Sequence, residues 1–179
     1  MITDCYDADS EPIVRLESFY GEKKHLVRKC VLIFSKQIYE YMLGNFACRQ
    51  IAEVRACNGN IPVWVLEHEG EDIAFYLTPI GSAIAAGTLA EVSYLTGASV
   101  FVMSGSCGSL DREATEGKLI VPTQAYRGEG MSYYFAKPQD YIEIKNAQKL
   151  AALFAQWRLP YVQGRVWTTD SMLRETVNL

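Results

Sequence analysis

The stretch from Phe101 to Leu110, FVMSGSCGSL, constrains the fold more than any other part of the chain. Its first residues, Phe101, Val102 and Met103, are apolar and β-compatible, which predicts a buried strand. It continues as SGSCGS, where the two glycines allow the backbone to turn sharply and to approach a ligand. Successive amides in such a turn can bind an anion, and the hydroxyls add donors. A plain small-residue turn is the alternative interpretation.

Apolar runs and helical periodicities alternate along the rest of the chain. The predicted strands are residues 30–34, 61–67, 73–78, 118–122 and 161–167. The predicted helices are one capped by Ser35, one from about 82 to 96 that stops at Gly97, one capped by Asn146, and a partial helix after 171. Residues 69–71 predict a hairpin turn, and residues 123–141 a long polar and aromatic loop. This alternation predicts an α/β sandwich around a mostly parallel sheet.

Three polar turns made of small residues follow predicted strands. They lie at Gly81, at 105–109 and at 168–171. In an open α/β sheet, ligands bind where the carboxyl ends of the strands meet. The three turns therefore predict a binding cleft at one edge of the sheet.

Composition limits the class of protein. The 179 residues suit one domain, which we expect at residues 26–179 after an N-terminal arm at 1–25. The net charge of −4 argues against nucleic acid as a partner, and no apolar run is long enough to cross a membrane. The five cysteines are scattered without a CxxC pair, and no secretion signal is visible, so we expect reduced thiols, no metal site and a cytoplasmic location.

Four segments, in order, resemble the nucleoside phosphorylase and nucleosidase superfamily of the purine and uridine phosphorylase type. Gly105-Ser-Cys-Gly108 is similar to the purine phosphorylase signature, and residues 123–135 are similar to the Arg-x-x-Gly-x-Ser-x-x-aromatic loop of the uridine branch. Thr168-Thr-Asp-Ser171 resembles a Ser-Ser-Asp or Ser-Ala-Asp turn, and Ile80-Gly-Ser82 a Gly-Ile-Gly turn. The resemblance implies a three-layer α/β/α sandwich with a central mixed, mostly parallel, twisted sheet.

The resemblance also implies a set of binding residues. Those expected at phosphate are Gly105, Ser106 and Arg127. Those expected at the nucleoside are Cys107, Gly108, Thr169, Asp170 and Met172. Each has a structural alternative: a small buried Cys107, a core Met172, an Asp170 that caps the last helix, and an Arg127 that pairs with Glu129.

The sequence departs from the family pattern at the phosphate. The positions of the family's three phosphate arginines are Tyr39, Asn58 and Met103 here. Because a buried phosphate needs compensating cations, Arg127 is the preferred replacement and Arg112 the other candidate. The Gln-x-Arg pair that reads uracil is absent, which favours a purine base. The family's Glu-Met-Glu stretch and its catalytic Asp would lie beyond Leu179, so we expect a chain truncated at its C-terminus with its catalytic residues outside it.

The function that the resemblance implies is cleavage of the N-glycosidic bond of a nucleoside by phosphorolysis. Inorganic phosphate would be the co-substrate, and no cofactor is expected. One alternative is a nucleosidase that uses water, and another is a silent binding or assembly protein of the same fold. The family also implies a homo-oligomer: a dimer, a trimer of dimers or a hexamer. A Rossmann-type nucleotide-binding domain is disfavoured because the glycines do not read GxGxxG.

Overall fold

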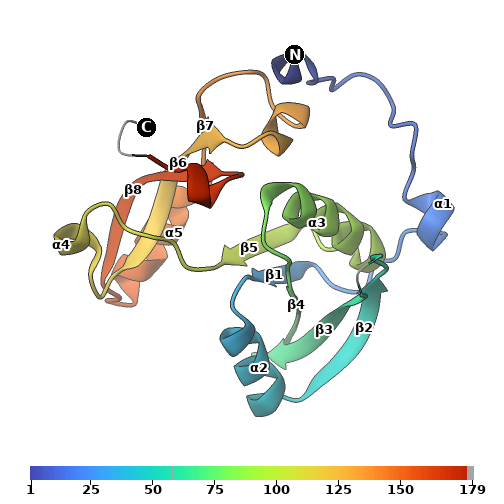
Figure 1. Ribbon diagram of the computed structural model, residues 1–179. Helices are drawn as coiled ribbons and strands as arrows, with labels where there is room; N and C mark the ends of the chain where they lie inside the picture. Colours follow the sequence, from blue (N-terminus) through green and yellow to red (C-terminus); the bar gives the residue numbers. More distant parts are fainter. Residues whose placement is uncertain (58, 177–179) are drawn as a thin grey trace. The chain divides into compact units, whose positions relative to one another are not determined.

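The computed structural model describes residues 1–57 and 59–176. They divide into two compact units (Figure 1). Ser10–Ser106 form the five-stranded unit, and Met1–Asp9 with the described residues from Cys107 onward form the three-stranded unit. The elements, in order, are η1 (Ile2–Asp4), α1 (Glu17–Tyr20), β1 (Lys29–Ile33), α2 (Lys36–Asn45), β2 (Cys48–Val54), β3 (Ile61–His68), β4 (Glu71–Leu77), α3 (Ser82–Thr96), β5 (Val100–Ser104), α4 (Arg112–Thr115), β6 (Leu119–Gly128), η2 (Met131–Tyr134), β7 (Tyr141–Glu143), α5 (Ala147–Gln156), β8 (Tyr161–Thr169) and η3 (Met172–Arg174).

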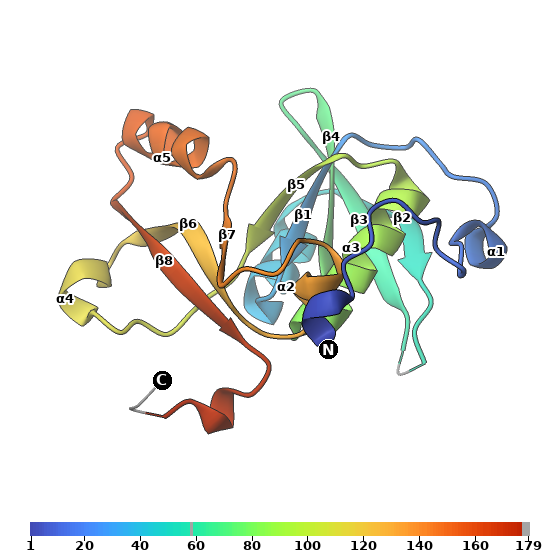
Figure 2. The ribbon, with the colours of Figure 1, turned by 90° about the horizontal axis from the view of Figure 1, so that it is seen from above.

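The sheet of the five-stranded unit has the order β2-β3-β4-β1-β5. Strand β1 lies between β4 and β5 and is parallel to both, whereas β2, β3 and β4 form an antiparallel meander (Figure 2). Helices lie in the connections of this parallel part: α2 follows β1, and α3 connects β4 to β5, the two strands that flank β1. The predicted α/β class with a mixed central sheet is confirmed.

Helices cover both faces of this sheet and give the expected three layers within the unit. On one face, Val92 of α3 packs in a cluster with the fully buried Leu32 and Tyr76. On the other face, Ile33 and Phe75 pack with residues of α2. Neighbouring residues of a strand point to opposite faces, so a strand covered on both sides is apolar without interruption. This is why β1 was recognisable as a run of apolar residues.

The turns of this unit follow the local chemistry of the sequence. Ser35 caps α2, and its hydroxyl accepts a hydrogen bond from the Ile38 amide at 3.4 Å. Gly97 ends α3 with a left-handed φ of 77°. Glu69 and Gly70 have φ values of 52° and 79°, which makes a two-residue hairpin turn whose twist matches that of the flanking strands.

The three-stranded unit has the sheet order β7-β6-β8. Strands β6 and β8 are parallel, with register from Leu119↔Tyr161 to Gly128↔Thr169, and β7 is antiparallel to β6. Helix α5 covers the sheet at the fully buried Val121. The first part of the predicted loop 123–141 is therefore strand. Its polar residues hid the signal, while pairing with β8 supplies the hydrogen bonds that keep it extended.

Two further expectations differ from the structure. Strand β2 was missed because Arg49, Gln50 and Glu53 interrupt its apolar residues, and it is defined by antiparallel pairing with β3. Strand β5 was expected to be buried, but Val102 and Met103 are 53% and 61% exposed, since β5 forms the edge of its sheet. The division into an arm, 1–25, and a domain, 26–179, stays a prediction. Across the described ranges, no helix has both the length and the apolar character needed to cross a membrane.

Candidate functional site

The glycine turn predicted after β5 is present at the carboxyl end of that strand. The Phe34 amide donates to the Ser104 carbonyl at 3.0 Å and ties the end of β1 to the end of β5. An added Cβ at Gly105 would lie 3.3 Å from the Cβ of Phe34, so a small residue suits this close approach. Within residues 1–57 and 59–176, no amide from Gly105 to Ser109 donates a hydrogen bond to the backbone. These donors are available to a ligand.

The second half of the turn is committed to local structure. The Ser109 hydroxyl donates to the Asp111 carbonyl at 2.8 Å and accepts from Thr115 at 2.6 Å. Asp111 then caps α4 by accepting from the Ala114 amide at 3.0 Å. Cys107 is exposed, which excludes its alternative role as a small buried residue. The Ser109 hydroxyl therefore belongs to the α4 cap and not to the predicted donor set.

In the three-stranded unit, the parallel strands β6 and β8 bring three predicted residues together. Arg127 is in register with Thr168, and Gly128 with Thr169. Just beyond the strands, the Asp170 amide donates to the Gly128 carbonyl at 3.2 Å. The Asp170 carboxylate accepts from the Gly130 amide at 2.9 Å. Asp170 thus joins the ends of both strands.

Gly128 shows why this strand end carries a glycine. An added Cβ would lie 2.5 Å from the Nε1 atom of Trp167 and 2.6 Å from the Thr168 carbonyl oxygen. A side chain at this position would collide with backbone as well as with the indole ring. The close approach of β6 and β8 at their carboxyl ends therefore depends on Gly128.

Arg127 is buried and holds the loop that follows β6. Its Nε donates to the Ser132 hydroxyl at 2.7 Å, and its Nη1 donates to the Lys137 and Gln139 carbonyls at 2.7 and 3.3 Å. Its Nη2 donates to the Ala136 carbonyl at 3.4 Å. The guanidinium also lies 3.8 Å from the ring centre of Tyr133, within range of a cation–π contact. In this structure the guanidinium of Arg127, which was predicted to bind phosphate, instead binds the loop that follows β6.

Glu129 completes this arrangement through Ser132. It is also buried, and its carboxylate accepts from the Ser132 amide at 3.0 Å and from the Ser132 hydroxyl. Ser132 therefore bridges the two charges. The structural alternative for Arg127, pairing with Glu129, takes the form of this Arg127–Ser132–Glu129 network, and we use that name below.

The remaining predicted positions are located as follows. Met172 lies in η3 and is 73% exposed, which excludes its alternative role in the core. Tyr39, at the place of a family phosphate arginine, accepts from the Trp64 indole at 2.8 Å and packs edge-on against Phe75, so it belongs to the core. Asn58 lies outside the described residues. That all three predicted turns meet in one cleft stays a prediction, because they are divided between the two units.

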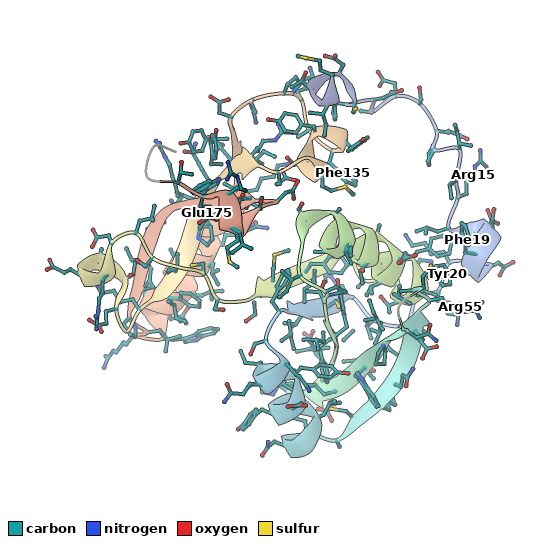
Figure 3. The ribbon with its side chains drawn as sticks, in the orientation of Figure 1. Arg15, Phe19, Tyr20, Arg55, Phe135 and Glu175 are labelled. Carbon is teal, nitrogen blue, oxygen red and sulfur yellow. The ribbon has the colours of Figure 1, made fainter. Side chains whose placement is uncertain are left out.

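The five-stranded unit has a groove that the sequence did not reveal. It has a volume of about 640 Å³ between α3 and the β2–β3 connection, with Val54 and Ile84 among its apolar walls and Glu91 at one side. The Tyr20 hydroxyl donates to Glu91 at 3.2 Å and accepts from the Arg55 amide at 3.2 Å. Figure 3 shows Tyr20 beside Arg55. Burial, followed by the charge of Glu91, raises the pKa of Tyr20. Its contacts come from residues 71 and 35 positions away, so no local pattern could have predicted it.

No cluster of metal ligands accompanies these features. In the part of the chain that the structure describes, no three His, Cys, Asp or Glu side chains come together in a way that could hold a metal ion. The candidate site of the three-stranded unit therefore consists of Thr169, Asp170 and the loop held by Arg127. The candidate site of the five-stranded unit consists of the turn at Gly105 and Ser106.

Solved structures with the same fold include both phosphorylases and hydrolases. A purine nucleoside phosphorylase from Toxoplasma gondii, in complex with immucillin-H, has a TM-score of 0.69 at 17% identity, covering 92% of this chain and 63% of that one. A futalosine hydrolase mutant from Helicobacter pylori has a TM-score of 0.67 at 14% identity, covering 86% and 71%. A methylthioadenosine/S-adenosylhomocysteine nucleosidase from the same organism has a TM-score of 0.66 at 14% identity, covering 84% and 71%.

These likenesses establish the fold, and the chain spans between 63% and 71% of the length of these three structures. No curated protein matches the sequence. The sequence model of the phosphorylase superfamily, in contrast, matches residues 37–179, which include every segment on which the resemblance rests. The match covers most of the 179 residues, and the fold agrees with it. This chain is a member of the phosphorylase superfamily.

Proposed function

We propose that this chain carries the nucleoside-binding part of an enzyme that cleaves the N-glycosidic bond of a purine nucleoside. The observation that carries the proposal is the turn at Gly105 and Ser106, whose amides follow a parallel strand and donate to no backbone group in the described part of the chain. Backbone amides at the carboxyl end of a parallel strand bind anionic or hydroxyl-rich ligands. Ser106 would donate to the ribose or to phosphate, and Cys107 and Gly108 would line the nucleoside.

The three-stranded unit would contribute the base-binding residues. Thr169 and Asp170 lie at the carboxyl ends of β6 and β8. The hydrogen bond between Asp170 and Gly130 fixes the start of the loop that follows β6. Met172, exposed just after this turn, is the side chain that we assign to the base. A flexible, polarisable thioether side chain suits contact with an aromatic ring such as a purine.

Phosphorolysis is the first candidate reaction. It is supported by the similarity to the Toxoplasma gondii phosphorylase, which has the highest TM-score of the three comparisons above. In this reaction, inorganic phosphate attacks the anomeric carbon as the bond to the base breaks, so the sugar phosphate and the free base are formed. The family resemblance assigns the phosphate to Gly105 and Ser106 of the five-stranded unit and to Arg127 of the three-stranded unit, and we expect no organic cofactor.

Hydrolysis is the second candidate, and one observation favours it. All the contacts of the Arg127 guanidinium recorded above are to its own loop, so an incoming phosphate would have to displace carbonyl groups. With water as the nucleophile, no dianion has to be compensated, and the loop can keep its structure. The two nucleosidase-type relatives reported above, both from Helicobacter pylori, are consistent with this route.

Release of free base separates the candidates. The full chain is incubated with inosine or adenosine, with and without inorganic phosphate, and the base is measured chromatographically. Release that requires phosphate supports phosphorolysis, and equal release without it supports hydrolysis. Binding of the nucleoside without release identifies the third possibility, a silent binding or assembly protein. Absence of both binding and release contradicts the proposal.

Assembly and location complete the proposal. We expect a homo-oligomer, because family members share sites between subunits. We also expect a cytoplasmic location. Sedimentation of the purified chain tests the oligomer directly. A chain that sediments as a monomer at all concentrations would contradict this part of the proposal while leaving the nucleoside chemistry to the base-release assay.

A further inference from the structure

The N-terminal residues pack against the aromatic loop of the three-stranded unit. Both ribbon views place η1 beside η2, and both elements belong to the same unit (Figures 1 and 2). These segments are more than 120 residues apart in sequence, so their contact is a property of the fold and not of local chain geometry. The N-terminus was expected to be an irregular arm, and nothing in its composition suggested a partner.

Gly130 lies in close contact with the N-terminal segment. An added Cβ at Gly130 would lie 2.9 Å from the Cδ1 atom of Ile2, so the isoleucine occupies the space that a side chain would need. The amide of the same glycine donates to the Asp170 carboxylate. Gly130 is thus in contact with Ile2 on one side and with a candidate nucleoside-binding residue on the other.

A second contact lies one turn further along each segment. A side-chain hydrogen bond with Cys5, followed by the charge of Cys5, raises the pKa of Tyr134, which puts the thiol next to the Tyr134 hydroxyl. The N-terminal segment therefore contacts the loop near both of its ends, at Gly130 and at Tyr134. We call residues 2–5 the strap and residues 129–135 the aromatic loop.

The aromatic loop is also held by the Arg127–Ser132–Glu129 network. That network fixes the loop to β6, and within residues 1–57 and 59–176 it forms no hydrogen bond or ion pair with Ile2 or Cys5. The strap adds an independent fixation at the loop's two ends. A loop with two independent fixations opens less often than a loop with one, because each must be lost before the loop is free.

We propose that the strap is a positioning element for nucleoside binding: its contacts at Gly130 and Tyr134 hold the aromatic loop, and through Gly130 they hold Asp170, in the geometry that receives the nucleoside. This inference rests on the proposed function. Ile2 and Gly130 are positioning residues, since they act through the loop and not on the reacting atoms. Loss of the strap weakens binding of the nucleoside and leaves the rate of the chemical step unchanged.

The test compares Ile2→Ala with Ile13→Ala in the full chain. Ile13 is fully exposed, so its substitution removes the same atoms from the N-terminal region without removing a contact. Amide hydrogen exchange is measured at Ser132, Phe135 and Ala136, whose amides are hydrogen-bonded within the loop. Affinity for inosine or adenosine is measured on the same samples. We expect Ile2→Ala to speed exchange and weaken affinity by roughly three- to tenfold, and Ile13→Ala to change neither.

A second variant tests the contact from the other side. Gly130→Ala places a methyl group against Ile2 and should loosen the loop in the same way, while the double variant with Ile2→Ala should be no worse than either single variant. Unchanged exchange in Ile2→Ala overturns the proposal, as does faster exchange with unchanged affinity. A wild-type chain that binds no nucleoside overturns the proposed function and the positioning role together, and the exchange data then still report whether the strap contacts the loop.

Discussion

Arg127 should be a structural residue of the aromatic loop, and its replacement should cost stability. The Arg127→Met variant keeps the length of the side chain but removes the donors to Ser132 and to the carbonyls of Ala136, Lys137 and Gln139. A hydrogen bond to a charged group contributes about 1.5–3 kcal/mol, and breaking one side of a buried charged arrangement costs about 3–5 kcal/mol. Because such terms overlap, we expect a loss of about 4 kcal/mol in the free energy of unfolding.

The assay is urea denaturation followed by tryptophan fluorescence, with Arg112→Met as the matched control. Arg112 forms an ion pair with Glu116 at 2.7 Å, but its side chain is 83% exposed. Exposed pairs contribute little, so this variant should unfold at the wild-type urea concentration. Arg127→Lys should lie between wild type and Arg127→Met, because a single ammonium cannot reach all four acceptors.

A loss of less than about 1 kcal/mol in the free energy of unfolding of Arg127→Met would refute the structural role of this guanidinium. An informative form of failure is a variant that is as stable as wild type but no longer gains thermal stability from inorganic phosphate. That result would mean that the guanidinium is turned towards phosphate in solution, as the family resemblance implies, and that the loop contacts contribute nothing.

Three further predictions concern Gly97, Tyr76 and Cys30. Gly97→Ala should lower the free energy of unfolding by about 3 kcal/mol in urea denaturation, because the left-handed φ costs about 1–2 kcal/mol and the new Cβ would lie 2.6 Å from the Lys24 carbonyl oxygen. The control Gly44→Ala, in α2 with open space around it, should raise the free energy of unfolding by about 0.5 kcal/mol, and equal effects of the two substitutions would contradict this prediction. Tyr76→Phe should raise the free energy of unfolding by about 1 kcal/mol, because the buried Tyr76 hydroxyl makes no hydrogen bond of ordinary geometry within the described residues, and a loss of similar size would contradict this. Burial raises the pKa of the Cys30 thiol to about 12, so the folded state binds the thiol proton more tightly than the unfolded state. The free energy of unfolding should therefore fall as the pH rises above 9, and it should fall less in Cys30→Ala. In thiol labelling at pH 8, Cys57 and Cys107 should react while Cys30 does not.

Much of the fold could be predicted because its signals are local. The Ser35 cap, the Gly97 stop and the Glu69–Gly70 turn each act within a few residues, and all were confirmed. Strand β1 was equally clear, since burial on both faces leaves an uninterrupted apolar run. Strand β2 and the second half of β6 were missed because their extended backbone depends on pairing with β3 and β8.

The site was harder to predict because its interactions join distant residues. The sequence pattern could indicate the turn at Gly105 and the strand end at Asp170, since both follow predicted strands. It could not show that Arg127 binds carbonyls 9 to 12 residues further on, nor that Ile2 lies against Gly130. The sequence does not distinguish a buried arginine from an exposed one. Only the tertiary structure shows which acceptors surround the guanidinium.

The most direct test of the account is an NMR titration of the ¹⁵N-labelled chain with inosine. The central claim is that the amides following β5 receive the nucleoside. We predict saturable shifts at Gly105, Ser106 and Gly108, with Gly44 and Gly164, which lie elsewhere in the chain, unchanged. Shifts confined to other residues, or none at Gly105 and Ser106 at saturating inosine, would contradict the claim.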